Sequence, residues 1–274
     1  MDFTLIEDIW NINEDTIDFY YFSGTGNTLL VVKKMRDTFE EKGINVNLYK
    51  IEESNPDDIN LGHIIGLAFP VAVFSTYPFV WDFMESLPHA NGTKIFMVDT
   101  LGGFSGGIVG PLRRIIERKG YFPIGAMEIQ MPSNIFYIQD EDTNQNKIQK
   151  GLIKAKTYAW DIMHGLAEWG RTPLLSDAMY LFSRGALKLT EIDLHQKYFL
   201  FKVDEEKCDK CRICDGLCPV GNIKMEPEEF PVHDLNCQYC MRCASFCPKH
   251  AIQSKFNYKG KIYRAIDILD FYRK

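Results

Sequence analysis

Residues 17–28 read Ile-Asp-Phe-Tyr-Tyr-Phe-Ser-Gly-Thr-Gly-Asn-Thr. The first six are mostly apolar and aromatic, which is typical of a buried strand. A loop of glycine and hydroxyl side chains follows, and a helical pattern then runs from about residue 27 to residue 42, where Gly43 ends it. Glycine lets the backbone approach a bound group closely, and the free N–H groups at a helix start attract an anion. The stretch therefore predicts a strand, a phosphate-binding loop and a helix in succession.

The same alternation of strand and helix continues to about residue 170. Further strands are expected at 44–51, 63–69, 94–99 and 121–130, and helices at 78–87, 108–119 and 145–169. This order predicts an α/β doubly wound fold, in which helices cover both faces of a parallel sheet. Ligands of such folds bind at the carboxyl ends of the strands. The loops after the first, third and fourth expected strands are rich in Gly, Ser, Thr or Pro, so all three are candidate ligand loops.

The loop at 23–28 lacks the features of two common nucleotide motifs. Leu29 stands where a dinucleotide fingerprint has its third glycine, and there is no Gly-Lys-Ser/Thr of a P-loop. The loop instead resembles the FMN-phosphate loop of flavodoxins. That resemblance implies FMN as a cofactor and a five-stranded parallel sheet in the order 2-1-3-4-5, in a domain of residues 1–170. The phosphate contacts that it implies are Ser23, Gly24, Thr25, Gly26, Asn27 and Thr28.

Flavodoxins clasp the flavin ring with the loops that follow the third and fourth strands. The resemblance therefore implies ring contacts from Pro70, Val71, Ala72, Val73 and Phe74, and from Thr100, Leu101, Gly102, Gly103, Phe104 and Gly107. Phe74, Tyr77 and Phe104 are candidates for stacking on the ring, while core packing is the alternative for each. The glycines of the second loop could also form a simple flexible turn. A fourth segment, 131–134, ends the last strand and is a further candidate contact.

All eight cysteines lie between residues 208 and 247, in two copies of one motif. The copies are Cys208-x2-Cys211-x2-Cys214-x3-Cys218-Pro219 and Cys237-x2-Cys240-x2-Cys243-x3-Cys247-Pro248. This is the spacing of bacterial ferredoxins, in which the fourth cysteine ligates the other [4Fe–4S] cluster. Cluster one is therefore expected on Cys208, Cys211, Cys214 and Cys247, and cluster two on Cys237, Cys240, Cys243 and Cys218. Structural zinc is the alternative, but zinc motifs use separated CxxC pairs.

The cysteines divide the chain of 274 residues, since none occurs before residue 208. This distribution predicts a C-terminal α+β ferredoxin module at 199–274, joined to the first domain by a helical connector at 171–198. A formal net charge of −6 gives no indication of nucleic acid as a partner. The most apolar stretch, 64–74, is too short to span a membrane, and the N-terminus has no signal-peptide pattern. A cytoplasmic protein is the resulting expectation.

The whole chain resembles flavodoxin–ferredoxin fusion proteins of archaea and anaerobic bacteria. That resemblance implies FMN, two [4Fe–4S] clusters and an anaerobic setting. The first hypothesis is a carrier that passes single electrons between a low-potential donor and a redox partner, such as ferredoxin or an oxidoreductase. The second is an enzyme whose clusters feed an FMN that reduces a quinone, a flavin or a metal-bound cofactor. The sequence shows no acid–base residue beside the expected ring, which favours the carrier and assigns no catalytic residue. A homodimer is left open, as is communication between flavin and clusters within one chain.

Overall fold

The computed structural model describes residues 16–103, 106–170, 175–190, 192–256 and 261–272. Its main sheet has five parallel strands in the order β2-β1-β3-β4-β5. The strands are β1 (Thr16–Tyr21), β2 (Asn45–Lys50), β3 (Ile64–Pro70), β4 (Lys94–Leu101) and β5 (Phe122–Gln130). This is the flavodoxin-like order, and it confirms the predicted fold. The central strands are buried on both faces, which explains their nearly continuous apolar sequences.

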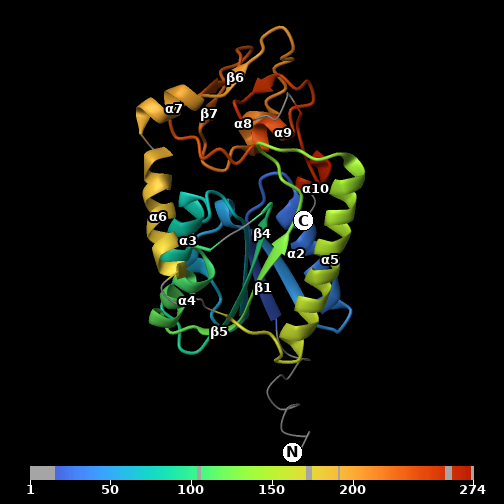
Figure 1. Cartoon of the computed structure of the whole chain (residues 1–274), viewed down its shortest axis with the longest axis vertical. Coiled ribbons are helices and arrows are strands. Elements are labelled where there is room, and N and C mark those ends of the chain that lie inside the picture. Colours follow the sequence, from blue (N-terminus) through green and yellow to red (C-terminus); the bar gives the residue numbers. More distant parts are fainter. Residues whose placement is uncertain (1–15, 104–105, 171–174, 191, 257–260, 273–274) are drawn as a thin grey trace, which may run out of the picture.

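Helices cover both faces of this sheet (Figure 1). On one face α2 (Asn27–Glu40) and α5 (Glu141–Met163) pack over side chains such as Phe19. On the other face α3 (Pro78–Ser86) and α4 (Val109–Arg118) pack over side chains such as Tyr20. Consecutive residues of β1 thus point into opposite core layers, as the pleat of a strand requires. Two short 3-10 turns, η1 (Ile51–Glu53) and η2 (Pro56–Asp58), follow β2.

The longest helix is displaced from its predicted bounds of 145–169. It begins at Glu141 because Asp140 caps it, its carboxylate accepting hydrogen bonds from the Thr143 backbone N–H and hydroxyl, each at 2.9 Å. It ends at Met163 because Gly165 adopts a left-handed backbone with φ of 65°. The predicted bounds followed the apolar periodicity alone and took neither cap into account.

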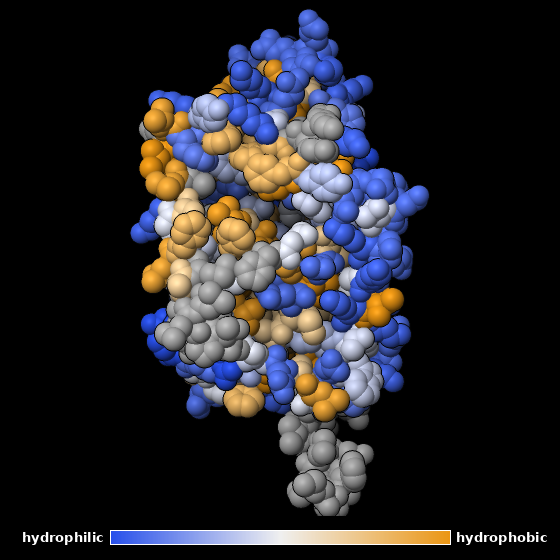
Figure 2. All heavy atoms as spheres, viewed as in Figure 1, coloured by the Kyte–Doolittle hydropathy of each residue, from blue (hydrophilic) through white to orange (hydrophobic). Residues whose placement is uncertain are grey.

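The helical connector predicted at 171–198 contains two helices in its described residues. These are α6 (Leu175–Thr190) and α7 (Asp193–Phe199). The first packs beside α3 and α4, with the rings of Trp81 and Tyr180 5.3 Å apart. The second holds the cysteine module, since the Gln196 side chain exchanges hydrogen bonds with the backbone N–H and carbonyl of Cys237 at 3.2 and 2.9 Å. Figure 2 shows hydrophobic residues gathered along the outside of the molecule on the side of this connector. The exposed large hydrophobic side chains of α6 and α7 include Leu181, Phe182, Leu189 and Leu194.

The C-terminal part is built from short elements. They are β6 (Lys202–Val203), α8 (Ile213–Leu217), β7 (Ile223–Lys224), β8 (Val232–His233), α9 (Arg242–Ser245), β9 (Ile252–Gln253) and α10 (Ile268–Tyr272). Strands β6 and β9 form one antiparallel pair, and β7 and β8 form another. We call residues 199–272 the cysteine module.

The doubled cysteine motif is also a doubled backbone. Left-handed residues recur at equal positions in the two copies: φ is 58° at Lys210 and 55° at Tyr239, and 63° at Arg212 and 64° at Met241. The residue three places after the fourth cysteine is also left-handed in both, with φ of 59° at Gly221 and 51° at His250. The two copies therefore wrap their cysteines in the same way.

The cysteine module packs on the carboxyl edge of the main sheet (Figure 1). The backbone N–H of Ala265 donates to the carbonyl of Thr25 at 2.8 Å, and the Tyr263 hydroxyl donates to Asn27 Oδ1 at 2.7 Å. The predicted phosphate loop thus contacts the module within one chain. Of the helices that the model describes, none combines the length and apolar character needed to cross a membrane.

Candidate functional site

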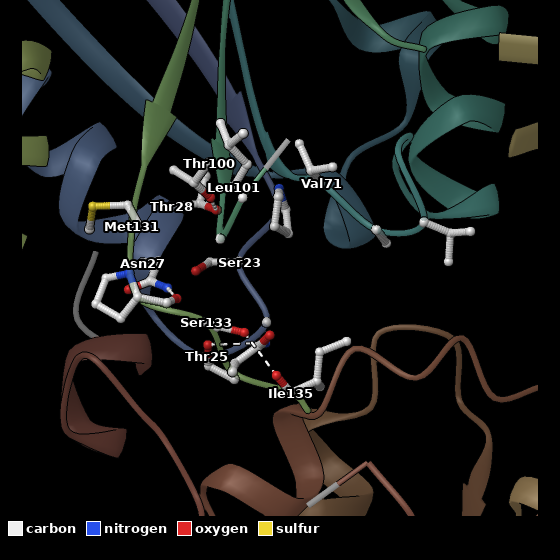
Figure 3. Close-up of a pocket in the computed structure, with 18 of the residues that line it drawn as sticks. Ser23, Thr25, Asn27, Thr28, Val71, Thr100, Leu101, Met131, Ser133 and Ile135 are labelled. Carbon is white, nitrogen blue, oxygen red and sulfur yellow. Dashed lines mark hydrogen bonds between the residues drawn. The ribbon is translucent and has the colours of Figure 1, made fainter. Parts of the chain in front are cut away.

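A cavity of about 500 Å³ lies where the loops after β1, β3, β4 and β5 meet. The predicted residues that line it are Ser23, Gly24, Thr25, Asn27, Thr28, Pro70, Val71, Ala72, Val73, Phe74, Thr100, Leu101, Gly102 and Gly103. The sequence analysis also named the stacking candidate Tyr77 and segment 131–134, and these line the cavity too. Figure 3 shows side chains from these loops around the cavity, with the cysteine module along its side near Thr25 and Ile135.

Two predicted residues that the structure describes, Gly26 and Gly107, stand apart from this lining. Gly26 precedes α2 with φ of 104°, so it sets the turn into the helix. Gly107 donates its N–H to the carbonyl of Phe74 at 3.1 Å and thereby ties two ligand loops together. Phe104 lies outside the described residues. Ile135 and Phe136 are lining residues that the sequence analysis missed. They follow the segment that it did name.

One end of the cavity is polar. The hydroxyls of Thr28, in the first turn of α2, and Thr100, near the end of β4, lie 2.8 Å apart. The Ser23 hydroxyl accepts from the backbone N–H of Leu29 at 3.3 Å. The N-terminus of α2 faces the same loop, as a phosphate site requires. Asn27 is engaged by protein groups, because its Nδ2 donates to the Pro132 carbonyl at 2.8 Å and its Oδ1 accepts from Tyr263. The hydroxyls and helix N–H groups are therefore better placed than this amide to meet a phosphate.

The other end of the cavity has an apolar rim. Ala72 and Ser75 exchange backbone hydrogen bonds at 2.7 and 2.9 Å, which closes a two-residue turn. Val73 and Phe74 occupy this turn with φ of 50° and 60°, a backbone that usually needs Gly or Asn. Each costs roughly 1–2 kcal/mol in this conformation. Buried anchors hold the strained turn: the Ser75 hydroxyl accepts from Trp81 Nε1 at 2.9 Å.

This lining fits flavin mononucleotide. A volume of about 500 Å³ lies within the range of small-molecule sites. Hydroxyls and a helix start at one end suit a phosphate, while Val71, Leu101 and the rim residue Phe74 offer apolar surface to a flat ring. Phe74 is 42% exposed, so it lies on the rim rather than in the core.

The eight cysteines line two further cavities. Cys218, Cys237, Cys240 and Cys243 line one, beside Phe201, Ile223 and His233. Cys208, Cys211, Cys214 and Cys247 line the other, beside Ile213, Met225 and Ile252. Each cavity takes three cysteines from one motif and the fourth from the other, which is the crossed grouping that the spacing predicts. All eight are free thiols rather than disulfides.

These thiols surround space instead of converging on a point. Four sulfurs on one zinc ion would each lie about 2.3 Å from it. Among the residues described, no three or more His, Cys, Asp or Glu side chains are placed to hold a single metal ion. Backbone N–H groups point at the crossed sulfurs, from Asn222 to Cys218 Sγ at 3.1 Å and from Ala251 to Cys247 Sγ at 3.3 Å. Such N–H···S contacts are among the features that tune iron–sulfur potentials.

Burial controls the charge of the thiols. It raises the pKa of Cys237 to about 12 and those of Cys240 and Cys214 to about 11, and it raises that of Cys243 well above the usual value. These four thiols are consequently protonated at neutral pH. Only metal binding would make them thiolates, so cluster assembly must release protons.

Arg242 is a further site residue that sequence reasoning missed. It lies between Cys240 and Cys243, and its Nε and Nη2 donate to the carbonyl of Ser23 at 3.1 and 2.8 Å. A signal was available, because the first motif has the apolar Ile213 at the equivalent position. Its partner Glu52 follows β2 and carried no sequence signal.

Asp99 gives a pH-dependent prediction. It is fully buried in β4 beside the cavity loops, and its two oxygens have no hydrogen-bond partner in the described part of the chain. Burial, with a smaller contribution from Glu128, raises its pKa well above 3.8. Above about pH 3.8 the unfolded chain loses the Asp99 proton while the folded chain keeps it. The free energy of unfolding therefore falls as pH rises. We expect Asp99→Asn to remove this fall. The free energy of unfolding of the variant, minus that of the natural chain, should therefore increase as pH rises. Urea unfolding from about pH 4 to about pH 8 measures this, and parallel pH profiles would contradict it.

Comparisons with known proteins found a family model for part of the chain and solved structures similar to another part. Residues 200–248 match the family model described as a 4Fe-4S dicluster domain. A flavodoxin from the domain Archaea is 16% identical, covering 52% of this chain and 97% of its own, with a TM-score of 0.38. The two-electron reduced flavodoxin of Megasphaera elsdenii is 23% identical, covering 50% and 98%, with a TM-score of 0.38. The rubredoxin oxygen:oxidoreductase of Desulfovibrio gigas is 14% identical, and the match covers 56% of this chain and 37% of that protein, with a TM-score of 0.40. Curated protein sequences give no match. The flavodoxin-like fold stated above rests on the chain's own strand order.

Proposed function

Because this chain joins a flavodoxin-like sheet to a 4Fe-4S dicluster domain, we propose that it passes single electrons between two [4Fe–4S] clusters and FMN. The observation that carries this proposal is the contact between the two sites. A Cβ on Gly24, in the phosphate loop, would lie 2.5 Å from the carbonyl oxygen of Cys240. The backbone of the second cysteine set therefore touches the candidate flavin loop.

FMN supplies a centre that accepts one or two electrons, and each cluster supplies a centre that accepts one. In this proposal Ser23, Thr25 and Thr28 bind the phosphate, and residues 70–74, 100–104 and 107 enclose the ring. The crossed cysteine sets bind the two clusters. The domain boundaries that we propose are 1–170 for the flavin domain, 171–198 for the connector and 199–274 for the cysteine module.

The two cysteine sets differ in their access to other proteins. Cys240 lies against the flavin domain, whereas Cys211 is exposed. The cluster on Cys208, Cys211, Cys214 and Cys247 is therefore the one that an external redox protein, a ferredoxin or an oxidoreductase, would approach. Eight free cysteines fit a reducing and anaerobic setting.

A second candidate function is reduction of a small acceptor at the flavin. The observation that favours it is the apolar rim, where Val73, Phe74 and Phe136 are 47%, 42% and 65% exposed at the mouth of the cavity. A flat quinone or a free flavin could stack there. This activity would use the same cofactors, so it is an alternative use of the same site.

Anaerobic purification with iron and flavin analysis tests both candidates. We expect about eight irons and one FMN per chain, and EPR signals on reduction. Stopped-flow mixing with reduced ferredoxin, and separately with quinones and flavins, then compares the acceptors. Faster exchange with protein carriers supports the carrier, and faster turnover of a small acceptor supports the enzyme. Zinc without flavin would contradict the proposal as a whole.

A further inference from the structure

Arg242 lies in the cysteine module and contacts Ser23, Glu52 and Phe22 of the first domain. Its side chain is 5% exposed, and its guanidinium donates twice to the Ser23 carbonyl and once, through Nη1 at 3.2 Å, to the Leu217 carbonyl. The guanidinium carbon lies 4.7 Å from the ring centre of Phe22 and 5.0 Å from that of Phe271. Protein groups therefore replace most of the hydration shell of this cation.

The counter-charge of Arg242 comes from the flavin domain. Glu52, in η1, is 6% exposed, and its Oε1 lies 2.6 Å from Arg242 Nη2. Both carboxylate oxygens of Glu52 are buried without a hydrogen bond among the residues described, so its contact with Arg242 is an ion pair. A buried ion pair of this kind is costly to assemble and costly to break on one side. The pair thus favours one placement of the module on the domain.

The position of Arg242 links three functional segments. It lies between Cys240 and Cys243, its contact Leu217 precedes the crossed ligand Cys218, and its contact Ser23 opens the phosphate loop. The first motif has Ile213 at the equivalent place, so holding a cluster does not itself require a charge there. The charge is specific to the motif that faces the flavin domain.

We infer that the Arg242–Glu52 pair positions the second cysteine set on the candidate flavin site and couples the charges of the two sites. This inference rests on the proposed function, since it concerns the centres proposed there. A centre gains negative charge on reduction, and charges act strongly across a poorly solvated interface. Arg242 should therefore favour the reduced state of nearby centres, and Glu52 should disfavour it.

Redox titration of the full chain, followed by EPR and visible absorption, tests this inference. We expect Arg242→Met to lower the reduction potentials of the second cluster and of the flavin, and Glu52→Gln to raise them. The double variant should lie between the two single variants. The first cluster should not respond to any of the three. Shifts of the same sign in both single variants, or no shift, would overturn the inference.

Arg212→Met is the matched control. Arg212 occupies the turn before α8 of the first motif, where it is half exposed and pairs with Asp215 at 2.7 Å. Its loss removes the same charge from the other copy of the motif. We expect the second cluster and the flavin to keep their potentials in this variant. A shift as large as that of Arg242→Met would show that any nearby charge acts equally.

Two more measurements separate a positioning role from simple loss of the fold. If Arg242→Met fails to fold because Glu52 loses its partner, the double variant and Arg242→Lys replace it. FMN titration of the flavin-free chain should show binding about tenfold weaker in the double variant, with partial recovery in Arg242→Lys. Unchanged FMN affinity and unchanged potentials in a folded double variant would overturn the inference. If the natural chain itself holds no iron or no flavin, the proposed function fails instead.

Discussion

Replacing Cys218 and Cys237 together by alanine should leave about four irons per chain, because both cysteines serve one cluster in the crossed arrangement. They belong to different motifs, yet their side chains line the same cavity. Replacing Cys218 together with Cys208 should instead remove both clusters, although these two cysteines share a motif. Cys208 lines the other cavity, so its loss affects the other cluster. Iron and sulfide analysis after anaerobic purification, with EPR of the reduced protein, gives the count.

The single variants provide the controls for this pair. Cys218→Ala, Cys237→Ala and Cys208→Ala should each lose one cluster and keep about four irons. An uncrossed arrangement predicts the opposite result for the doubles, with about four irons kept by Cys208→Ala with Cys218→Ala. The experiment thus distinguishes the two ligand assignments without knowledge of any redox partner.

Gly24→Ala should separate the phosphate loop from the cysteine module. The added Cβ would lie 2.5 Å from the Cys240 carbonyl oxygen, and this neighbour is backbone that cannot rotate away. Overpacking of a tight contact typically costs about 1–3 kcal/mol. We therefore expect a lower free energy of unfolding and weaker FMN binding. Chemical unfolding and FMN titration of the full chain measure the two effects.

Gly185→Ala is the matched control for this substitution. Gly185 lies in α6, and a Cβ added there meets no atom within 4 Å. The same methyl group should leave FMN affinity unchanged and stabilise the helix slightly, by up to about 1 kcal/mol. If Gly24→Ala behaved like this control, the close packing of loop and module would be refuted.

The sequence predicted local features well, and one family resemblance supplied the strand order. The run from Ile17 to Thr28 encodes its own strand, loop and helix through composition, and the cysteine spacing encodes the crossed grouping. By contrast, the pairing of Glu52 with Arg242 joins residues far apart in the chain, and no periodicity records such a contact. Asn27 was expected to bind a phosphate, but in the structure its amide forms hydrogen bonds with the Pro132 carbonyl and the Tyr263 hydroxyl.

Backbone conformation was the other feature that the sequence did not reveal. Val73 and Phe74 form a left-handed turn without the Gly or Asn that usually announces one. Surrounding contacts override local preference there, through anchors such as Trp81. Gly24 was interpreted as room for a phosphate, and the structure adds that its missing side chain also makes room for Cys240.

The mutual burial of the two parts has a consequence for dissection of this protein. Cutting the gene at the connector would give two halves that each expose groups buried in the intact chain. The first half would expose the Glu52 carboxylate and Phe22, and the second half would expose Arg242. The chain should therefore be studied as one unit. Separate halves would need to be produced together, or resurfaced at these positions, before their properties could be compared with those of the intact protein.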